Sequence, residues 1–575
     1  MSAPTTAVVG LGSVGEALLH LLHAAGHRVV AVDTDLDALA RAGRRLKAAF
    51  PEGPDRPAVT FTADHALVRG AGIVVEAVPE DAALKSAVLS RIVALVPPGT
   101  PLVTTTAGLS VARLGTSAGR PADVVGLRLF GPPAPGAPAV PVRTALASRP
   151  TATALDGLVA DTGLTPVPIG ARPAADATAL VLAFLNRAVV LRDEGYATAS
   201  GIDTAMRLGC GLPAGPLETL DRIGLDTAHR ALCELWRRTG DHAFEPAPLL
   251  SRMVAAERLG RKTGRGFYAY DDAGAVLDRA DDGARPAGTA RPVRRVGVVG
   301  SGAMARGIAE VTASAGHPTV LLARSTDKAD RALTAIEESL TRGVRRGKVT
   351  ARGKEDALDL LDATADPGWL SGCDLVIEAV AEDLAAKRAV FARLGEVCAP
   401  GTVLATTTSS LPVAECARAS GRPADVVGVH FFNPAPVMRL VELVHTDAAA
   451  PDALATARAF VTGLGKTAVE CADRTGFIVN GLLFPYLGAA LALLDRADVD
   501  IEETDAAIQR GFGYPMGPFA LLDTIGLDVS LAIQERLYED FATPEHEPSP
   551  VLAELVAAGL LGRKNERGLC TAGAR

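Results

Sequence analysis

A tandem repeat constrains this chain more than any other feature, because segments of its first half recur in order in its second half. The segment AVVGLGSVGEALLHLLHAAGHRVV near the start returns as GVVGSGAMARGIAEVTASAGHPTV after residue 296. Four more pairs follow: VVEAVPEDAALK with VIEAVAEDLAAK, PADVVG with itself, GPLETLDRIGLD with GPFALLDTIGLD, and LGRKTGRGFY with LGRKNERGLC. The offset is 290 residues at the front and 302 thereafter, so the second copy has 12 additional residues after its second predicted strand. The repeat indicates that one unit is built twice.

Each unit is predicted to contain two domains. Strand and helix patterns alternate in its first part, as a parallel sheet requires, and its last 100 or so residues are mostly helical in pattern. The predicted fold is an α/β Rossmann domain plus an all-α C-terminal domain, with the pair repeated twice in tandem. The expected boundaries are 1–168 (Rossmann), 169–270 (helical), 271–292 (a linker rich in Asp, Gly, Ala and Pro), 293–470 (Rossmann) and 471–575 (helical).

Composition excludes several classes of function. The net charge of -8 argues against a general nucleic-acid binder. Seven cysteines without a CxxC or metal-ligand spacing predict reduced thiols in the cytoplasm and no metal site. Residues 476–494 are apolar enough to cross a bilayer, but Asn480 and Pro485 interrupt them and no basic flank follows. We therefore expect a buried core helix there, no secretory segment at the start, and no membrane partner.

The first unit carries a dinucleotide-binding pattern. Gly10, Gly12 and Gly15 form a GxGxxG motif that follows a predicted strand and opens a helix. The glycines permit a tight turn and close approach of the backbone to a pyrophosphate, which then lies at the helix N-terminus. Asp33 ends the next strand, where its carboxylate can accept hydrogen bonds from the ribose hydroxyls.

The second unit carries a variant of the same pattern. Its GxGxxA motif consists of Gly300, Gly302 and Ala305. Ala323 stands at the position of Asp33 and is followed by Arg324 and Ser325. The change removes a carboxylate that would repel a 2′-phosphate and adds groups that bind one. We therefore predict that the second unit prefers NADP(H) or accepts both NADP(H) and NAD(H). The alternative is a solvated basic loop after a strand.

Three motifs of the second unit then make a resemblance specific: TTTSSLPV, VVGVHFFNPAPVMRLVELV and DRTGFIVN. HFFNP with a glutamate twelve residues beyond its His, an upstream TSSL and a downstream GFIVN resemble the 3-hydroxyacyl-CoA dehydrogenase family. The match runs along essentially the whole of each unit. The resemblance implies a Rossmann domain plus a helical dimerisation domain, a nicotinamide cofactor and (S)-3-hydroxyacyl-CoA substrates.

The resemblance also assigns roles to single residues. It makes His430 the general acid/base and Glu442 its orienting partner. Three further positions match polar residues of the family's active site: Ser409, Asn433 and Asn480. Glu382 and Lys387 match a pair near the nicotinamide and the cleft. The residue types suit the chemistry, because an imidazole titrates near working pH, a carboxylate fixes its tautomer, and Ser and Asn can hydrogen-bond the reacting oxygen and the thioester carbonyl.

The 12 additional residues lengthen a basic helical stretch at 339–354. In the family, a helical hairpin at this place meets the acyl-CoA, and Arg345 and Lys348 suit its phosphates. A solvated charged face is the alternative for each single residue.

The first unit lacks the catalytic residues. The equivalents of Ser409, His430, Asn433, Glu442 and Asn480 are Ala107, Arg128, Gly131, Val140 and Thr178. An arginine stays protonated and cannot act as a base, and losing a positioned base removes roughly a hundred- to ten-thousandfold of rate. The glycine motif, Asp33, Glu80 and Lys85 remain. We expect a folded pseudo-enzyme that serves as a built-in dimer partner, with a regulatory nucleotide sensor as the alternative.

Other functions stay open at the level of the sequence. The hydride chemistry could act on an acyl-carrier-protein thioester or a free hydroxy acid instead of a CoA thioester. A non-catalytic nucleotide-binding scaffold fits the first unit alone. The two helical domains are expected to form an internal pseudo-dimer, which leaves a further homo-oligomer open.

Overall fold

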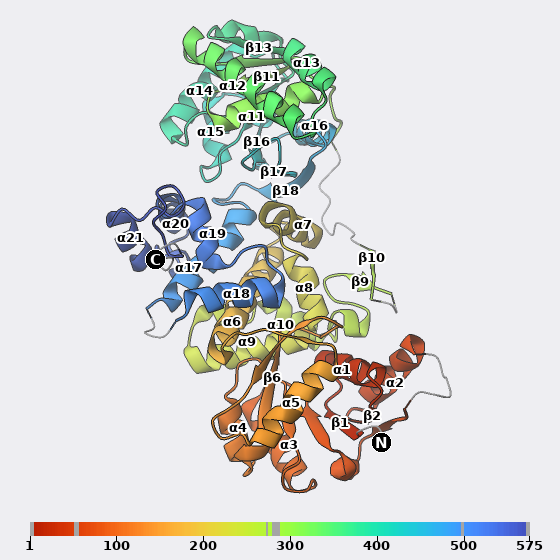
Figure 1. Ribbon diagram of the computed structural model, residues 1–575. Helices are drawn as coiled ribbons and strands as arrows, with labels where there is room; N and C mark the ends of the chain where they lie inside the picture. The colour runs from red at the N-terminus through yellow and green to blue at the C-terminus, as the bar shows by residue number, and fades with distance from the viewer. Residues whose placement is uncertain (1–4, 51–56, 272–273, 279–287, 496–498, 571–575) are drawn as a thin grey trace.

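The computed structural model confirms the tandem architecture, with a Rossmann-like domain and a helical domain in each unit. It describes residues 5–50, 57–271, 274–278, 288–495 and 499–570. The first Rossmann domain and the second lie at opposite ends of the molecule, and both helical domains lie between them (Figure 1).

The two Rossmann sheets have the same topology. Each has eight strands, in the order β3-β2-β1-β4-β5-β6-β7-β8 in the first unit and β13-β12-β11-β14-β15-β16-β17-β18 in the second. All neighbours are parallel except β6 with β7 and β16 with β17. The first sheet consists of β1 (Thr5–Val9), β2 (Arg28–Val32), β3 (Val59–Thr62), β4 (Ile73–Glu76), β5 (Leu102–Thr104), β6 (Val124–Leu129), β7 (Pro138–Val142) and β8 (Thr165–Pro166). The second consists of β11 (Val296–Val299), β12 (Thr319–Leu322), β13 (Leu361–Thr364), β14 (Leu375–Glu378), β15 (Val403–Thr406), β16 (Val426–Phe431), β17 (Leu440–His445) and β18 (Thr467–Ala472).

Helices cover both faces of each sheet, so its central strands are buried apolar runs, as parallel sheets require. The first domain has α1 (Ser13–Ala24), α2 (Leu36–Ala49), α3 (Ala82–Val93), α4 (Val111–Ser117) and α5 (Arg149–Asp161). The second has α11 (Ala303–Ser314), α12 (Thr326–Arg345), α13 (Ala351–Asp359), α14 (Leu384–Val397), α15 (Val413–Ala419) and α16 (Pro451–Gly463). The 12 additional residues extend α12 and add α13, which has no counterpart among the described residues of the first unit.

The helical domains pack against one another around one apolar core. They consist of α6 (Ala171–Asp193), α7 (Ala199–Cys210), α8 (Pro216–Ile223), α9 (Leu225–Thr239) and α10 (Pro248–Ala255), and of α17 (Val479–Leu493), α18 (Ile501–Phe512), α19 (Pro518–Ile525), α20 (Leu527–Phe541) and α21 (Pro550–Ala557). Helix α6 packs against α17 and α18 of the other unit, and buried side chains of both domains form a single cluster. The apolar stretch at 476–494 thus contains a buried core helix, as predicted. By length and composition α6 could also span a membrane, but 67% of its most apolar window is buried inside the protein.

Two predicted boundaries differ in detail from the structure. Strand β10 (Val276–Asp278) pairs with β9 (Ala269–Tyr270), so the predicted linker at 271–292 begins with a short hairpin; its residues 272–273 and 279–287 lie outside the described residues. Strand β18 runs through Ala472 and crosses the predicted division at residue 470. The reason is that β18 is the edge strand of the sheet and pairs along the whole length of β17.

Polar contacts between the units lie at the rim of the shared core. Arg187 on α6 forms an ion pair with Glu545, and its guanidinium lies 3.5 Å from Nε2 of His546, in a short 3₁₀ turn of the second unit. Burial, reinforced by the charges of Arg187 and Arg474, lowers the pKa of His546 to about 3. The neutral imidazole is therefore the form that the folded protein accommodates.

This contact predicts an acid-sensitive step in stability. Because the pKa of His546 is lowered in the folded state, its contribution is fully present above about pH 6.5 and is lost as the pH falls below that value. Between pH 6.5 and 5 the loss amounts to about 2 kcal/mol. We expect His546→Gln to lose correspondingly less of its free energy of unfolding than the unmodified protein over this range, as measured by urea denaturation. An identical acid dependence in both proteins would contradict the assignment.

Candidate active site

A histidine and a glutamate face one another across two antiparallel strands. His430 on β16 and Glu442 on β17 are direct partners in the register, and Nδ1 of His430 lies 2.7 Å from Oε2 of Glu442. His430 is 5% exposed and Glu442 is fully buried. Because an ionised carboxylate only accepts hydrogen bonds, Nδ1 is the donor. In the neutral ring, Nε2 is then the nitrogen that carries no hydrogen. Nε2 lies 3.1 Å from the hydroxyl of Ser409.

The second oxygen of the carboxylate is held by the main chain. Oε1 of Glu442 accepts hydrogen bonds from the N–H groups of Ile478 (3.1 Å) and Val479 (2.9 Å), where α17 begins. The rings of Phe432 and Phe477 pack against the imidazole, with centroids 4.6 and 5.4 Å from its own. The histidine therefore has one orientation, with Nε2 directed toward Ser409.

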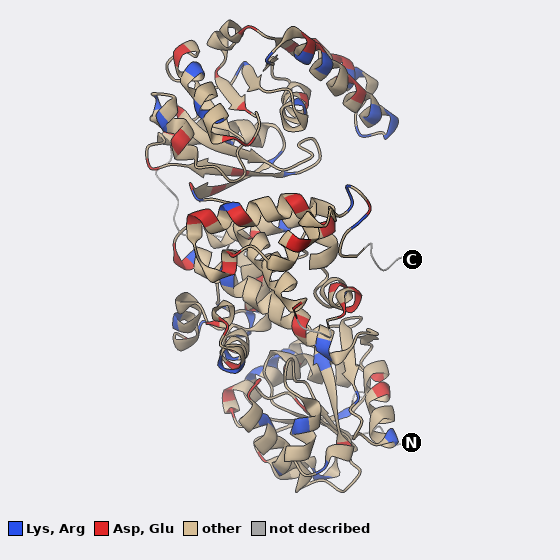
Figure 2. Cartoon of the chain, turned by 90° about the vertical axis from the view of Figure 1, so that its left-hand side faces the viewer, with Lys and Arg blue, Asp and Glu red and all other residues tan. Residues whose placement is uncertain are grey.

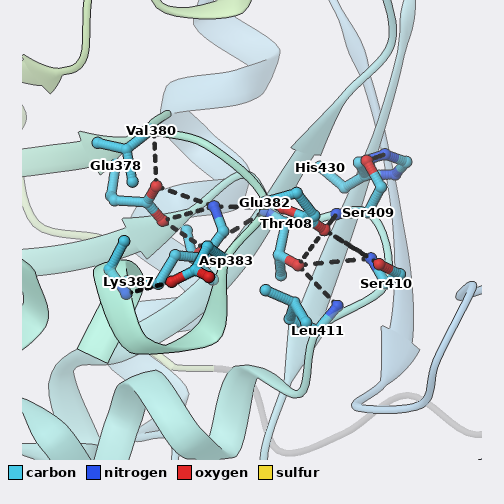
Figure 3. A network of polar contacts seen from close by, with 12 residues as sticks. Glu378, Val380, Glu382, Asp383, Lys387, Thr408, Ser409, Ser410, Leu411 and His430 are labelled. Carbon is cyan, nitrogen blue, oxygen red and sulfur yellow. Dashed lines mark hydrogen bonds and ion pairs between the residues drawn. The ribbon is translucent and has the colours of Figure 1, made fainter. Parts of the chain in front are cut away.

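An ion pair between Glu382 and the buried Lys387 supports the loop that carries Ser409. Glu382 accepts four hydrogen bonds on Oε1, from the hydroxyls of Thr408 (2.7 Å) and Ser410 (3.2 Å) and from the N–H groups of Ser409 (2.8 Å) and Ser410 (3.0 Å) (Figure 3). Burial alone would raise the pKa of Glu382, but the charge of Lys387 and these hydrogen bonds lower it below its ordinary value. Glu382 is therefore an anion at neutral pH, and it fixes the backbone next to the histidine.

The predicted residues do not all lie together. Lys387 is 1% exposed, and its ammonium binds Glu378 at 2.9 Å and Glu382 at 3.4 Å, so it is enclosed between two carboxylates (Figure 3). The sequence had not singled out Glu378, although it begins the repeated Glu-Ala-Val segment. The other two predicted polar residues lie near the ends of elements that carry the pair: Asn433 is an exposed residue that follows β16, and Asn480 is the second residue of α17.

The first unit keeps this support but not the reactive groups. Lys85 binds Glu76 at 2.8 Å, and Glu80 accepts hydrogen bonds from Thr106 and from the main chain of Gly108. However, Ala107, the residue equivalent to Ser409, has a methyl group in place of the serine hydroxyl. Both units therefore have the same supporting ion pairs, but the residue beside them is a serine in the second unit and an alanine in the first.

Arg128 and Val140 occupy the paired positions of the histidine and the glutamate on β6 and β7. The Arg128 guanidinium donates to the carbonyl oxygen of Ala171 at 2.8 Å, and Val140 is buried. Burial lowers the pKa of Arg128, but a guanidinium remains protonated and offers no base.

The glycine motifs form open turns before uncapped helices. Gly300 has a φ of +132°, and a Cβ at Gly302 would meet nothing within 4 Å. Helix α11 follows with no side-chain cap, which leaves its first N–H groups free for a phosphate. In the first unit, a Cβ at Gly15 would lie 1.8 Å from the carbonyl oxygen of Gly10. The second unit accommodates the methyl group of Ala305 at this position with a different φ of the first glycine.

The ends of the second strands differ as predicted from the sequence. Asp33 accepts hydrogen bonds from the N–H groups of Leu11 (2.6 Å) and Asp35 (2.9 Å), so its carboxylate is fixed beside the glycine turn. In the second unit, Ala323 is buried while Arg324 and Ser325 are exposed at the start of α12. The chain thus presents a carboxylate at one turn and a guanidinium with a hydroxyl at the other.

A cavity of about 740 Å³ lies in the first unit, between its Rossmann domain and its helical domain. It is lined by the glycine turn, Asp33 and Lys262, and also by Phe512 from the helical domain of the second unit. Two hydrogen bonds join its walls, from the Ser13 hydroxyl to the carbonyl oxygen of Ile223 (2.8 Å) and from Arg45 to that of Lys262 (3.2 Å). No pattern in the sequence indicates that Phe512 belongs to this cavity, because it comes from the other unit.

The basic hairpin projects from the second Rossmann domain. Arg345 ends α12 and Lys348 lies in the turn before α13, and both side chains are exposed. In the cartoon of Figure 2, the blue of Lys and Arg positions colours the tip of this hairpin.

Two family models match the chain, each of them twice. The model of the 3-hydroxyacyl-CoA dehydrogenase NAD-binding domain matches residues 5–171 and 295–474, and that of the C-terminal domain of the same family matches residues 177–270 and 476–572. The chain belongs to the 3-hydroxyacyl-CoA dehydrogenase family. It is therefore an oxidoreductase with a nicotinamide cofactor, and the predicted fold and duplication are confirmed.

The first two relatives each match about half of the chain, and a solved structure matches nearly all of it. The 3-hydroxybutyryl-CoA dehydrogenase of Mycobacterium tuberculosis is 45% identical over 285 residues, which are 48% of this chain and 98% of that protein. The human mitochondrial hydroxyacyl-coenzyme A dehydrogenase is 40% identical over 284 residues, 48% of this chain and 90% of that one. A solved structure of 3-hydroxybutyryl-CoA dehydrogenase from Escherichia coli covers 97% of this chain and 100% of its own, with a TM-score of 0.57 and 19% identity, and shows the shared fold.

The glutamate that supports the Ser409 loop has a matched control in the first unit. We expect Glu382→Gln to lower kcat by roughly ten- to hundredfold, because an amide cannot accept the hydrogen bonds of Thr408, Ser409 and Ser410 as the carboxylate does. Glu80→Gln removes the same kind of support and should lower the free energy of unfolding similarly, with kcat unchanged. Steady-state rates and urea denaturation of both variants test this, and equal losses of kcat would refute it.

Proposed function

We propose that the second unit interconverts (S)-3-hydroxyacyl-CoA and 3-oxoacyl-CoA by hydride transfer, and that the first unit is a non-catalytic partner. The observation that carries this is the buried chain of hydrogen bonds from Glu442 through His430 to Ser409. None of its three members is present in the first unit. Relatives named as 3-hydroxybutyryl-CoA and hydroxyacyl-coenzyme A dehydrogenases support the substrate class.

The geometry supplies a positioned acid and base. In oxidation, Nε2 of the neutral His430 accepts the proton of the substrate hydroxyl, and Glu442 stabilises the imidazolium that forms. In reduction, the same imidazolium donates the proton to the 3-oxo group. The Ser409 hydroxyl, 3.1 Å from Nε2, hydrogen-bonds the same oxygen. Asn433, which follows the strand of His430, and Asn480, at the start of α17, are assigned to the thioester end of the substrate.

The residues of the second glycine turn fit a dinucleotide. Gly302 leaves room for a phosphate at the uncapped start of α11, and Arg324 and Ser325 lie exposed where the adenosine ribose is expected. When bound, the nicotinamide supplies or accepts the hydride. The absence of a carboxylate at Ala323 favours NADP(H) in this unit, whereas Asp33 favours NAD(H) in the first.

The remaining assignments rest on charge and redox state. Arg345 and Lys348, exposed at the tip of the α12–α13 hairpin, are proposed to bind phosphates of coenzyme A. All seven cysteines are free thiols, which supports a reducing, cytoplasmic compartment.

The central experiment compares the unmodified chain with His430→Ala. The unmodified chain should reduce acetoacetyl-CoA, with kcat in His430→Ala lower by about a hundred- to ten-thousandfold, because the positioned acid is lost. Arg128→Ala, at the equivalent place in the first unit, should leave kcat unchanged. Initial rates from the oxidation of reduced nicotinamide measure both. Full activity of the His430 variant would contradict the assignment of His430 as the acid and base.

Cofactor preference is tested at the end of β12. We expect Arg324→Ala to raise the KM for NADPH about tenfold and to leave the KM for NADH unchanged, because only NADPH carries the 2′-phosphate. Ala323→Asp, which restores the carboxylate of the first unit, should shift preference in the same direction. Rates with NADPH and NADH side by side give the answer, and faster turnover of NADH by the unmodified chain would discard the NADP(H) inference.

A further inference from the structure

In each unit, one helix of the helical domain packs against the Rossmann sheet of the other unit. Helix α7 of the first unit packs against β17 and β18 of the second, and lies beside them in Figure 1. Helix α18, the equivalent of α7, packs against β7 of the first unit. Each sheet edge is therefore covered by a helix from the other unit.

A glycine allows α7 to approach the catalytic strand closely. A Cβ at Gly209 would lie 2.9 Å from Cγ2 of Val479 and 3.0 Å from Cδ2 of Leu440. Leu440 begins β17, the strand of Glu442, and the N–H of Val479 donates to Glu442. A β-branched side chain on a helix has little freedom to move away, so a larger residue at Gly209 would displace the start of α17.

Two more residues of the first unit lie around the same carboxylate. The Tyr196 hydroxyl donates to the carbonyl oxygen of Ala472 at 3.1 Å. Burial raises the pKa of Tyr196, reinforced by Cys471 and Glu442, and burial with Glu442 raises the pKa of Cys210 to about 12. These two groups are therefore neutral and add no charge beside Glu442.

We infer that the first unit completes the active site of the second, with Gly209 as a positioning residue that lets α7 hold the start of α17 and its two N–H groups on Glu442. The inference rests on the proposed function, since Glu442 acts through His430. It explains why a unit without catalytic residues is kept in register with its partner: the helix that covers the active sheet belongs to the degenerate unit.

The chain contains its own control for this contact. Gly511 on α18 is the equivalent of Gly209, and a Cβ there would lie 2.5 Å from the ring of Phe130. The strand that α18 covers carries Val140 in place of Glu442. A bulky residue at Gly511 therefore disturbs the same type of interface, with at least as close a clash, where no catalytic group depends on it.

The experiment compares Gly209→Leu with Gly511→Leu in the full chain. We expect Gly209→Leu to lower kcat for acetoacetyl-CoA at least about tenfold, with KM values within about threefold. The pH at which reduction slows should move lower, because a loosened Glu442 stabilises the imidazolium less. The Gly511→Leu variant should keep the kcat and pH profile of the unmodified chain. Thermal unfolding and gel filtration establish that both are folded, and Gly209→Ala serves as the milder variant if the Leu variant is not.

A second readout does not depend on turnover. The NMR titration of the His430 imidazole should shift in the Gly209 variants and not in Gly511→Leu. Folded Gly209 variants with unchanged kcat and unchanged titration would overturn the inference, as would equal effects at the two glycines. If the unmodified chain neither reduces a 3-oxoacyl thioester nor oxidises a 3-hydroxyacyl thioester, the proposed function fails. A shifted titration at Gly209 alone would then still support the positioning role, and an unshifted one would refute it.

Discussion

The pairing of two apolar helical domains is the constraint on which the rest of the structure depends. Helix α6 alone has 23 residues, most of them apolar, and α17 and α18 of the other unit cover the part of it that α8, α9 and α10 of its own unit do not. Apolar surfaces of this extent are not stable in water. Joining the two units in one chain makes the partner available at high effective concentration, without a second molecule. Both Rossmann domains are then attached to a common centre (Figure 1).

In this arrangement, the residues that stabilise the fold are different from the residues that the proposed reaction requires. The buried pairs Lys85–Glu76 and Lys387–Glu378 are both kept, because a buried ammonium that lost its carboxylate would be strongly destabilising. The pair of His430 and Glu442 can be replaced without leaving an unpaired buried charge when both residues change together. With Val140 in place of the glutamate, no buried carboxylate is left unpaired, and the Arg128 guanidinium donates to a carbonyl oxygen instead.

Much of this could be predicted from the sequence, because glycine turns, strand ends and the HFFNP motif are local. The twelve-residue separation of His430 and Glu442 follows from two strands joined by a connection, although only the register shows that they pair directly. The burial of Lys387 was missed because its partner Glu378 lies on a strand, nine positions earlier. The contributions of Phe512 and Gly209 could not be predicted, since both depend on how one unit lies on the other.

The two units also differ in the hydrogen bonds that join the Rossmann domain to the helical domain. In the first, Ser13 and Arg45 donate from the Rossmann domain to carbonyl oxygens of its helical domain and close the walls of the cavity. The equivalent positions of the second unit are Ala303 and Ala335, whose methyl groups have no hydrogen to donate. Under the proposed function, the second unit must admit and release a thioester, and hydrogen bonds of this kind would oppose each cycle. The first unit has no substrate to release under the same proposal, so it can keep these hydrogen bonds, which hold the helical domain that carries the helix beside Glu442.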